Sequence, residues 1–173
     1  RGFIALMQSC ILGHAVKDNV VITGRGGNLL LRGISSVLSV RIAAPLDTRV
    51  ARIMARDSLT AEAAKWLAER TDNERAGFIR TVYGKKWDDP DEYDMVFDTG
   101  RQSENEIVDI ISKALSEKGT LPANDRTLID RAEAARVKAA LLTNPKFFLP
   151  TLDVYHDGKS IILRGVVHSP KER

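Results

Sequence analysis

Apolar and polar positions along the chain follow two periods, that of a helix and that of a strand. Apolar residues three or four positions apart predict helices over residues 3–16 and 47–56. Short β-branched runs predict strands at 20–23 and 39–43, and the segment YDMVFDTG predicts a third strand that ends near Asp98. Strands that alternate with helices in this way indicate a parallel sheet covered on both faces. We therefore expect an α/β fold.

Two further helices have clear capping signals. Thr60 is a predicted N-cap of a long helix that stops at Gly84. Ser103, followed by Glu106 three residues later, gives the capping-box pattern of a helix that begins in the next residues. These signals predict where the helices flanking the third strand begin and end.

The segment NVVITGRGGNLLL, residues 19–31, has the look of a strand that enters a phosphate-binding loop. A Walker-type loop needs Lys and Ser/Thr directly after its last glycine, but Gly27 is followed by Asn28 and Leu29. Leu29 also stands where a dinucleotide fingerprint needs its third glycine. Arg25 is the one charged residue of this loop. Since ligands bind at the carboxyl ends of parallel strands, we expect residues 24–28, 44–47 and 98–100 to lie along one rim.

The character of the sequence changes near residue 119. GTLPANDR, residues 119–126, has the composition of a linker. A helical pattern then leads to two short apolar runs joined by the turn sequence DGK, which predicts a hairpin. One helix and two strands bury too little to fold independently. We therefore expect this piece to rest on another part of the protein or on a partner.

Composition narrows the functional classes. A formal charge of +3 and a pI near 9.1 suit phosphorylated metabolites as well as nucleic acid, but aromatic residues are not interleaved with the arginines, so nucleic acid is an unlikely partner. No apolar run approaches the roughly 20 residues of a membrane span. The single Cys10 is expected to be buried and indicates a reducing, cytoplasmic setting. His14, His156 and His168 have no metal-ligand spacing, so no metal site is predicted.

Several segments together resemble a known family. They cover residues 3–115 and read VVITGRGGNLLL, SVRIAAPLDTRVARI, AERTDNERAGFIRTVYGKKWDDPDEYDMVFDTG and SENEIVDIISKAL. The combination is similar to the cytidylate kinase-like proteins, a branch of the P-loop nucleoside monophosphate kinases. The resemblance implies a parallel-sheet kinase-like domain at 1–118 and a linker at 119–126. No G-x-x-x-x-G-K-[ST] occurs in the sequence, so we expect the phosphate-loop part to lie upstream of these residues.

The C-terminal part resembles a second family. Residues 137–167 are similar to the first half of a BON module, a small domain associated with phospholipid or protein binding. We therefore expect a partial, α+β BON-like module at 127–173. This resemblance implies a protein or phospholipid partner.

The kinase resemblance implies phosphoryl transfer from ATP, with Mg²⁺, to a nucleoside monophosphate. On this interpretation the catalytic residues are Arg75 and Arg80, and the substrate-binding residues are Gly24, Arg25, Arg70 and Asp72. Arginine suits these roles because its planar fork donates two hydrogen bonds to a phosphate. The base stays open, since Gly26 stands where cytidylate kinases carry an acidic residue. The alternative function is a non-catalytic nucleotide-sensing or adaptor protein that acts through the BON-like module.

Three of these residues, Arg70, Arg75 and Arg80, lie in the predicted lid helix. Residues five apart on a regular helix diverge by about 140°, so the three face one ligand only if the helix breaks. Gly77 is the expected break. Asp72 and Arg75 are expected to pair because they are three positions apart. The alternative is that these charges form a solvated helix face.

Overall fold

The computed structural model describes residues 1–118 and 126–166, which fall into two compact units. The first unit contains Arg1–Thr23, Gly33–Ser36 and the described residues from 126 onward. The second contains Gly24–Arg32 and residues 37–118. All but one residue of the expected linker at 119–126 lies outside the described residues.

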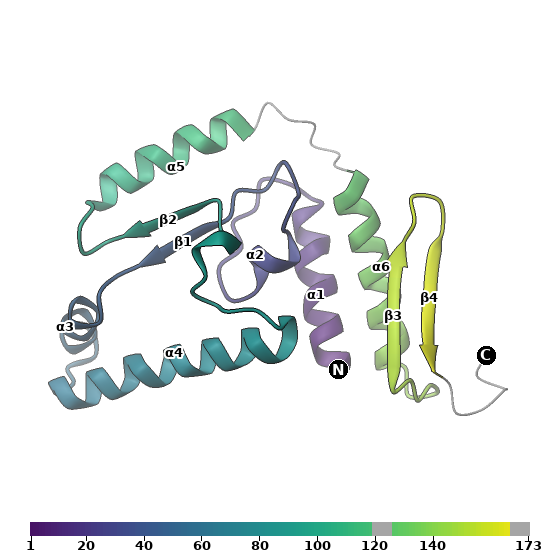
Figure 1. Cartoon of the computed structure of the whole chain (residues 1–173), viewed down its shortest axis with the longest axis horizontal. Coiled ribbons are helices and arrows are strands. Elements are labelled where there is room, and N and C mark those ends of the chain that lie inside the picture. The colour runs from purple at the N-terminus through teal and green to yellow at the C-terminus, as the bar shows by residue number, and fades with distance from the viewer. Residues whose placement is uncertain (119–125, 167–173) are drawn as a thin grey trace. The chain divides into compact units, whose positions relative to one another are not determined.

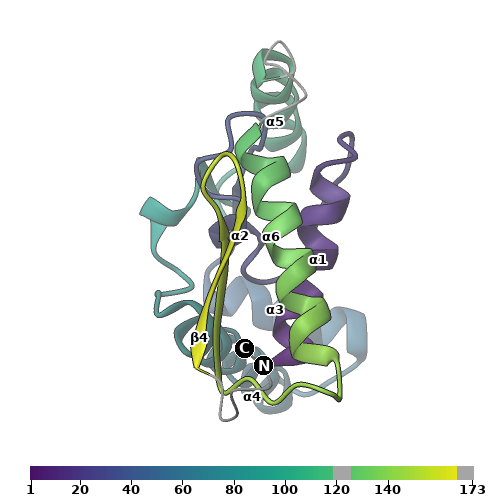
Figure 2. The same cartoon turned by 90° about the vertical axis from the view of Figure 1, so that its right-hand side faces the viewer.

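The first unit is built on helix α6 (Arg126–Thr143). Helix α1 (Gly2–Ala15) lies along one side of α6, and the hairpin of β3 (Thr151–His156) and β4 (Ile161–Val166) lies along the other (Figures 1 and 2). The buried apolar side chains among its described residues are Ala5, Leu12, Ile34, Leu128, Ala134 and Ala139. Helix α1 therefore packs with the C-terminal elements, whereas the sequence groups it with the kinase-like residues 1–118.

The predicted hairpin is confirmed. β3 and β4 pair antiparallel, with Thr151 opposite Val166 and His156 opposite Ile161. Gly158 takes a φ of 92° in the turn, a conformation that glycine adopts without strain. Asp157 accepts hydrogen bonds from the backbone N–H groups of Lys159 and Ser160, so the turn is closed by its own side chain.

The second unit is a small parallel sheet with helices on both sides. Strands β1 (Val40–Ala43) and β2 (Met95–Asp98) pair in parallel, with helix α4 (Ala61–Tyr83) on one side and α5 (Glu104–Lys118) on the other (Figure 1). Helix α3 (Leu46–Asp57) packs on α4. The short helices are α2 (Gly27–Leu30) and η1 (Pro90–Glu92). The buried core includes Ala64, Ala68, Ile79, Phe97 and Ile107.

The capping predictions are confirmed. The hydroxyl of Thr60 accepts from Ala63 N–H at 3.3 Å, and Gly84 closes α4 with a φ of 66°. Before α5, the N–H of Ser103 donates to Glu106 Oε2 at 2.9 Å and the N–H of Glu106 donates to Ser103 Oγ at 3.3 Å. The hydroxyl of Ser103 also donates to Glu106 Oε2, at 2.8 Å. The hydrogen bonds from the backbone N–H and the hydroxyl of Ser103 lower the pKa of Glu106. The caps hold α4 and α5 at the flanks of β2.

Three sequence expectations are wrong. Residues 20–23 are not a strand, because no described strand pairs with them, and Val21 is 89% exposed. Cys10 is exposed rather than buried. Helix α4 continues through Gly77 without a break, since its hydrogen-bonded turns tolerate a single glycine at modest cost.

Gly26 is a position where a side chain does not fit. Its φ is 78°, and a Cβ there would lie 2.5 Å from Cε2 of Tyr83. We predict that Gly26→Ala destabilises the protein by about 2–4 kcal/mol, combining left-handed strain with a clash. Gly84→Ala is the matched control, because Gly84 also has a positive φ but open space around it. Urea unfolding of both variants measures the difference; equal losses would contradict the packing role of Tyr83.

Candidate phosphate-binding site

The glycine loop does not lie on the expected rim. At the carboxyl ends of β1 and β2, the N–H of Thr99 donates to Ala43 O at 2.9 Å, and Arg52 donates to the hydroxyl and carbonyl of Thr99. Asn28 instead donates to the carbonyl of Glu92, which precedes β2. The loop therefore lies toward the opposite end of the sheet. The expectation that the loop lies on the rim depended on a strand at 20–23, and these residues do not form one.

Gly24 and Arg25 lie in this loop, beside the C-terminal end of α4. The guanidinium of Arg25 sits 5.8 Å from the ring centroid of Phe78, and its side chain is on the exposed surface. Gly24 has a φ of 146°, with open space where a Cβ would be. The hydroxyl of Tyr83, packed against Gly26, is buried and has no hydrogen-bond partner among the described residues. An arginine and an unsatisfied hydroxyl thus border the loop.

A second group of residues gathers around Asp72 and Trp87; we call it the arginine cluster. It comprises Arg41 of β1, Arg49 of α3, Arg75 and Asp72 of α4, and Trp87 of the following loop. Nη1 of Arg49 lies 2.8 Å from Asp72 Oδ2, and Nη1 of Arg75 lies 3.4 Å from Asp72 Oδ1. The predicted pairing of Asp72 with Arg75 is confirmed.

The indole of Trp87 makes cation–π contacts with two of these arginines. The guanidinium of Arg41 stacks 4.2 Å from the ring centroid and donates to the Trp87 carbonyl at 2.9 Å. The guanidinium of Arg75 lies 5.7 Å from the same centroid. Tyr93 Oη donates to the same carbonyl at 2.8 Å, which fixes the loop. Cation–π contacts of this kind hold guanidinium groups in place while leaving their N–H donors open.

The arginine cluster has an excess of positive charge. Two guanidinium groups, those of Arg49 and Arg75, pair with the carboxylate of Asp72, and their side chains are 31% and 42% exposed. The third, that of Arg41, stacks on the same indole as Arg75. Half-buried guanidinium groups that outnumber their carboxylate partners favour a bound anion. The sequence analysis did not single out Arg41, Arg49 or Trp87 as site residues. Arg41 could have been noticed because it is a charged residue inside the apolar strand pattern of residues 39–43.

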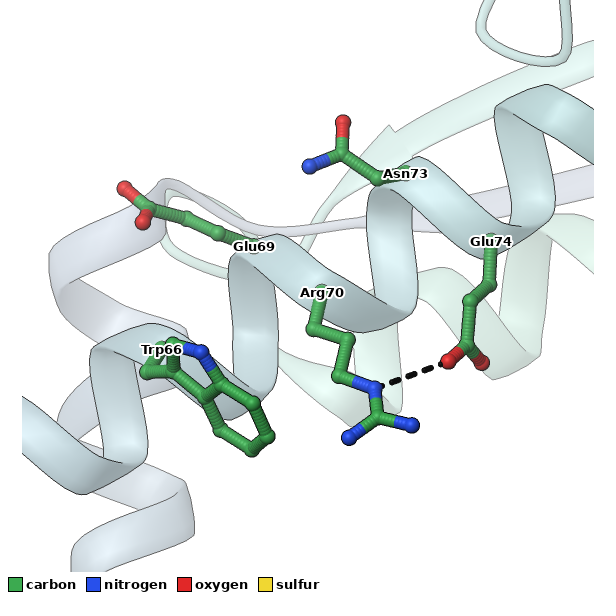
Figure 3. A pocket seen from close by; sticks show the side chains of 5 residues that line it. All are labelled: Trp66, Glu69, Arg70, Asn73 and Glu74. Carbon is green, nitrogen blue, oxygen red and sulfur yellow. Dashed lines mark hydrogen bonds and ion pairs between the residues drawn. The ribbon is translucent and has the colours of Figure 1, made fainter.

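Arg70 lies apart from the arginine cluster. It belongs to a shallow hollow of α4 lined by Trp66, Glu69, Arg70, Asn73 and Glu74 (Figure 3). Its Nε donates to Glu74 Oε1 at 3.0 Å, and its guanidinium lies 5.0 Å from the ring of Trp66. All five lining residues come from one helix, and none belongs to the arginine cluster. Arg70 therefore fits the solvated-face alternative in this conformation.

Arg80 is exposed near the end of α4. Because α4 stays helical through Gly77, Arg80 points about 140° away from Arg75 around the helix axis. The expected convergence of Arg70, Arg75 and Arg80 is thus wrong for this conformation. Arg75 converges instead with Arg41 and Arg49, which come from other elements.

Glu92 anchors the glycine loop. Its carboxylate is 5% exposed, pairs with Arg32, and lies 2.8 Å from Lys85 Nζ. The hydrogen bond from Lys85, together with the charges of Arg32 and Lys85, lowers the pKa of Glu92 against the opposing effect of burial. Lys85 follows α4 and Arg32 follows α2, so this carboxylate ties both segments to the start of β2.

The lowered pKa of Glu92 predicts how stability depends on pH. The ion pairs contribute fully above the pKa of an unfolded glutamate, about 4.5, and are lost as the pH falls through the lower, folded pKa. Unfolding midpoints in urea should therefore fall on acidification below that value. In Glu92→Gln this part of the acid dependence should disappear and the midpoint at neutral pH should be lower. An unchanged acid profile in the variant would contradict this role.

Comparison with known proteins identifies the family to which this α/β chain belongs. The profile of the Cytidylate kinase-like family matches residues 3–101. The chain belongs to this family. The match contains the glycine loop and the whole arginine cluster.

Curated relatives match about three fifths of this chain. A cytidylate kinase from Methanocaldococcus jannaschii is 33% identical over 104 residues, and one from Sulfolobus acidocaldarius is 34% identical over 103 residues. The alignments cover 58% and 59% of this chain and 58% and 56% of those proteins. A protein named uronate isomerase from Corynebacterium glutamicum is 31% identical over 104 residues, which is 20% of its length. The chain thus spans less than three fifths of the curated relatives it matches.

A solved structure shares the fold. It is the crystal structure of an uncharacterized protein from Eubacterium ventriosum, with a TM-score of 0.60 and 24% identity over 66% of this chain and 65% of that one. The likeness supports the mixed α/β arrangement of the chain. Among the described residues, no helix has both the length and the apolar character needed to cross a membrane.

Proposed function

We propose that this chain is part of an ATP-dependent nucleoside monophosphate kinase and contributes its phosphate-handling arginines. The observation that carries the proposal is the arginine cluster, which lies within the family-matched residues. In it Arg49 and Arg75 pair with one carboxylate, and Arg41 and Arg75 lie on one indole. The relatives named cytidylate kinase support the same activity.

The proposed chemistry needs mainly positioning and charge stabilisation. An oxygen of the acceptor phosphate attacks the γ-phosphorus of ATP, the bond to the β-phosphate oxygen breaks, and ADP leaves. Bound ATP supplies the transferred group, and Mg²⁺ neutralises its charge. The guanidinium excess of the arginine cluster fits such phosphates. Asp72 acts as a positioning residue, because it holds Arg49 and Arg75 rather than meeting phosphate itself.

The glycine loop provides a second contact point. Gly24 lets the backbone approach a ligand, Arg25 brings positive charge, and the buried hydroxyl of Tyr83 lacks a hydrogen-bond partner among the described residues. We assign the acceptor nucleotide to these groups. Arg80 is exposed and available to phosphates if the lid moves when substrate binds. Arg70 would have to leave Glu74 before it could take part.

A kinase assay tests the proposal. A form of the protein that includes a phosphate loop should release ADP from ATP when supplied with one of the common nucleoside monophosphates, whereas the 173 residues alone should not. The sequence of these residues contains no lysine and Ser/Thr in Walker spacing to hold the donor phosphates. Turnover by the 173-residue chain would contradict this division of roles.

A nucleotide-sensing or adaptor protein is the second proposal. The observation that favours it is the apolar surface of β4, where Leu163 and Val166 are 55% and 56% exposed. In this proposal the BON-like C-terminal part binds a protein or phospholipid partner, and the kinase-like part binds nucleotide without turnover. Failure of the longer form to phosphorylate any acceptor, with nucleotide binding retained, would favour this function.

A further inference from the structure

The first unit contains a cluster of three potential metal ligands that the sequence did not predict. Asp130 and Glu133 are three residues apart on α6, and His156 ends β3, which packs on that helix. Each of the three offers one ligand atom, and these atoms lie within 4.8 Å of one another. The sequence-based prediction of no metal site considered only the spacing of the three histidines. It missed this cluster because the carboxylates lie more than 20 residues upstream of His156.

The imidazole of His156 is buried, and its Nε2 faces Glu133. The side chain is 6% exposed, and Nδ1 accepts a hydrogen bond from the N–H of Gly158 at 3.0 Å and lies 3.3 Å from Asp130 Oδ2. Nε2 faces Glu133 Oε2 at 3.9 Å, which is too far for a hydrogen bond, and it bonds to no other described residue. Nε2 therefore points into the cluster, toward the carboxylate of Glu133.

One carboxylate oxygen of Asp130 lacks a hydrogen bond among the described residues. Its Oδ1 is buried and makes no hydrogen bond among the described residues, although Arg126 Nε lies 2.9 Å away in an ion pair. Arg126 is 67% exposed and is free to swing into solvent. The side chain of Glu133 is 43% exposed, so the cluster is open to solvent on its side. A buried imidazole, a carboxylate oxygen whose ion-pair partner is exposed, and a side open to solvent are the features that a bound cation would use.

We propose that Asp130, Glu133 and His156 bind a divalent transition-metal ion such as Zn²⁺. A neutral imidazole with two carboxylates is a ligand set for Zn²⁺ and its neighbours in the first transition row, whereas Ca²⁺ and Mg²⁺ prefer oxygen ligands throughout. Binding of the ion through Nε2 would place the imidazole proton on Nδ1, which would then donate to Asp130 Oδ2 instead of accepting from the N–H of Gly158.

The ion would join α6 to β3. The hairpin contributes two strands and packs on one helix, so few contacts hold its end in place. His156 is the last residue of β3, directly before the turn, and a metal there fixes the turn end of the hairpin to the first half of α6. Metal binding then adds to the folding free energy of this unit.

Zinc titration of the whole 173-residue chain tests the proposal. After dialysis against EDTA, ZnCl₂ is titrated by calorimetry, and thermal unfolding is followed by circular dichroism with and without zinc. We expect one equivalent of Zn²⁺ to bind and to raise Tm. Glu133→Gln and His156→Gln should each weaken zinc binding at least about tenfold, the usual effect of losing a ligand. His14→Gln is the matched control, because His14 is exposed on α1 outside the cluster, and it should bind as the parent does.

Several outcomes would overturn the proposal. Zinc affinity that survives both substitutions would place the binding elsewhere. Equal binding of Mg²⁺ would reduce it to attraction by the carboxylates, and the absence of any zinc effect would leave the three residues as an ion-paired contact between helix and hairpin. If His156→Gln fails to fold, Glu133→Gln decides the matter, since its side chain is partly exposed.

Discussion

Replacing Arg75 with alanine, in a form of the protein that carries a phosphate loop, should lower kcat by about 100-fold or more, because removing a donor aimed at developing charge costs a few kcal/mol. Arg75 lies over Trp87 and pairs with Asp72, so its fork is held before substrate arrives. The fold should survive, since the side chain is 42% exposed. Coupled detection of ADP release gives kcat and KM, and circular dichroism checks the fold.

Two variants bracket this result. Arg75→Lys keeps the charge but loses the planar fork, so it should recover only part of the rate. Arg56→Ala removes an exposed arginine of α3 that pairs with its neighbour Asp57, and it should leave kcat unchanged. A loss of less than about threefold in Arg75→Ala would contradict the proposed role, since one such donor is worth far more.

Arg80 offers a test of lid motion within the same assay. In this conformation it points away from Arg75 on a continuous α4. A kcat loss in Arg80→Ala as large as that in Arg75→Ala would show that α4 changes shape when substrate binds. Gly77 is the position in α4 where we would expect the helix to bend. An unaffected Arg80→Ala would remove Arg80 from the catalytic residues.

Arg41→Ala should weaken binding of a nucleoside monophosphate by about 1.5–3 kcal/mol, the scale of a charge-assisted hydrogen bond, which is roughly 10- to 150-fold in Kd. Arg41 stacks on Trp87 and is bonded to its carbonyl, so it presents its remaining N–H groups in a fixed direction. Calorimetry on the folded variant measures the loss.

Two comparisons identify which contact meets the phosphate. Arg25→Ala should give a loss of similar size if the glycine loop also holds the acceptor, as proposed. Trp87→Phe keeps an aromatic surface under Arg41, so it should reduce affinity less than Arg41→Ala does. If Arg41→Ala binds as the parent does while Arg25→Ala does not, the acceptor belongs to the loop alone.

The helices of the chain could be predicted because their signals are local. Thr60, Gly84 and the Ser103–Glu106 capping box specify helix ends within a few residues, and each makes the expected bonds. The segment at 20–23 failed because a strand needs a partner at a distance. Its β-branched residues fit a pleated strand, but no described strand lies beside them.

The site was predicted only in part, for the same reason. The pairing of Asp72 with Arg75 follows from spacing on one helix, so sequence finds it. The convergence of Arg75 with Arg41 and Arg49 depends on how a strand and two helices pack, which no local pattern records. The zinc ligands proposed on α6 and β3 are hidden in the same way.

The most direct test of the central claim compares a nucleoside monophosphate with its parent nucleoside by calorimetry on the 173-residue chain. If the arginine cluster binds phosphate, the monophosphate should bind at least about tenfold more tightly than the nucleoside, because the two differ only in the group that guanidinium donors recognise. The Arg41→Ala/Arg49→Ala double variant should lose that difference and keep its fold. Equal affinity of the parent chain for both compounds, or a preference that survives in the double variant, would contradict the account.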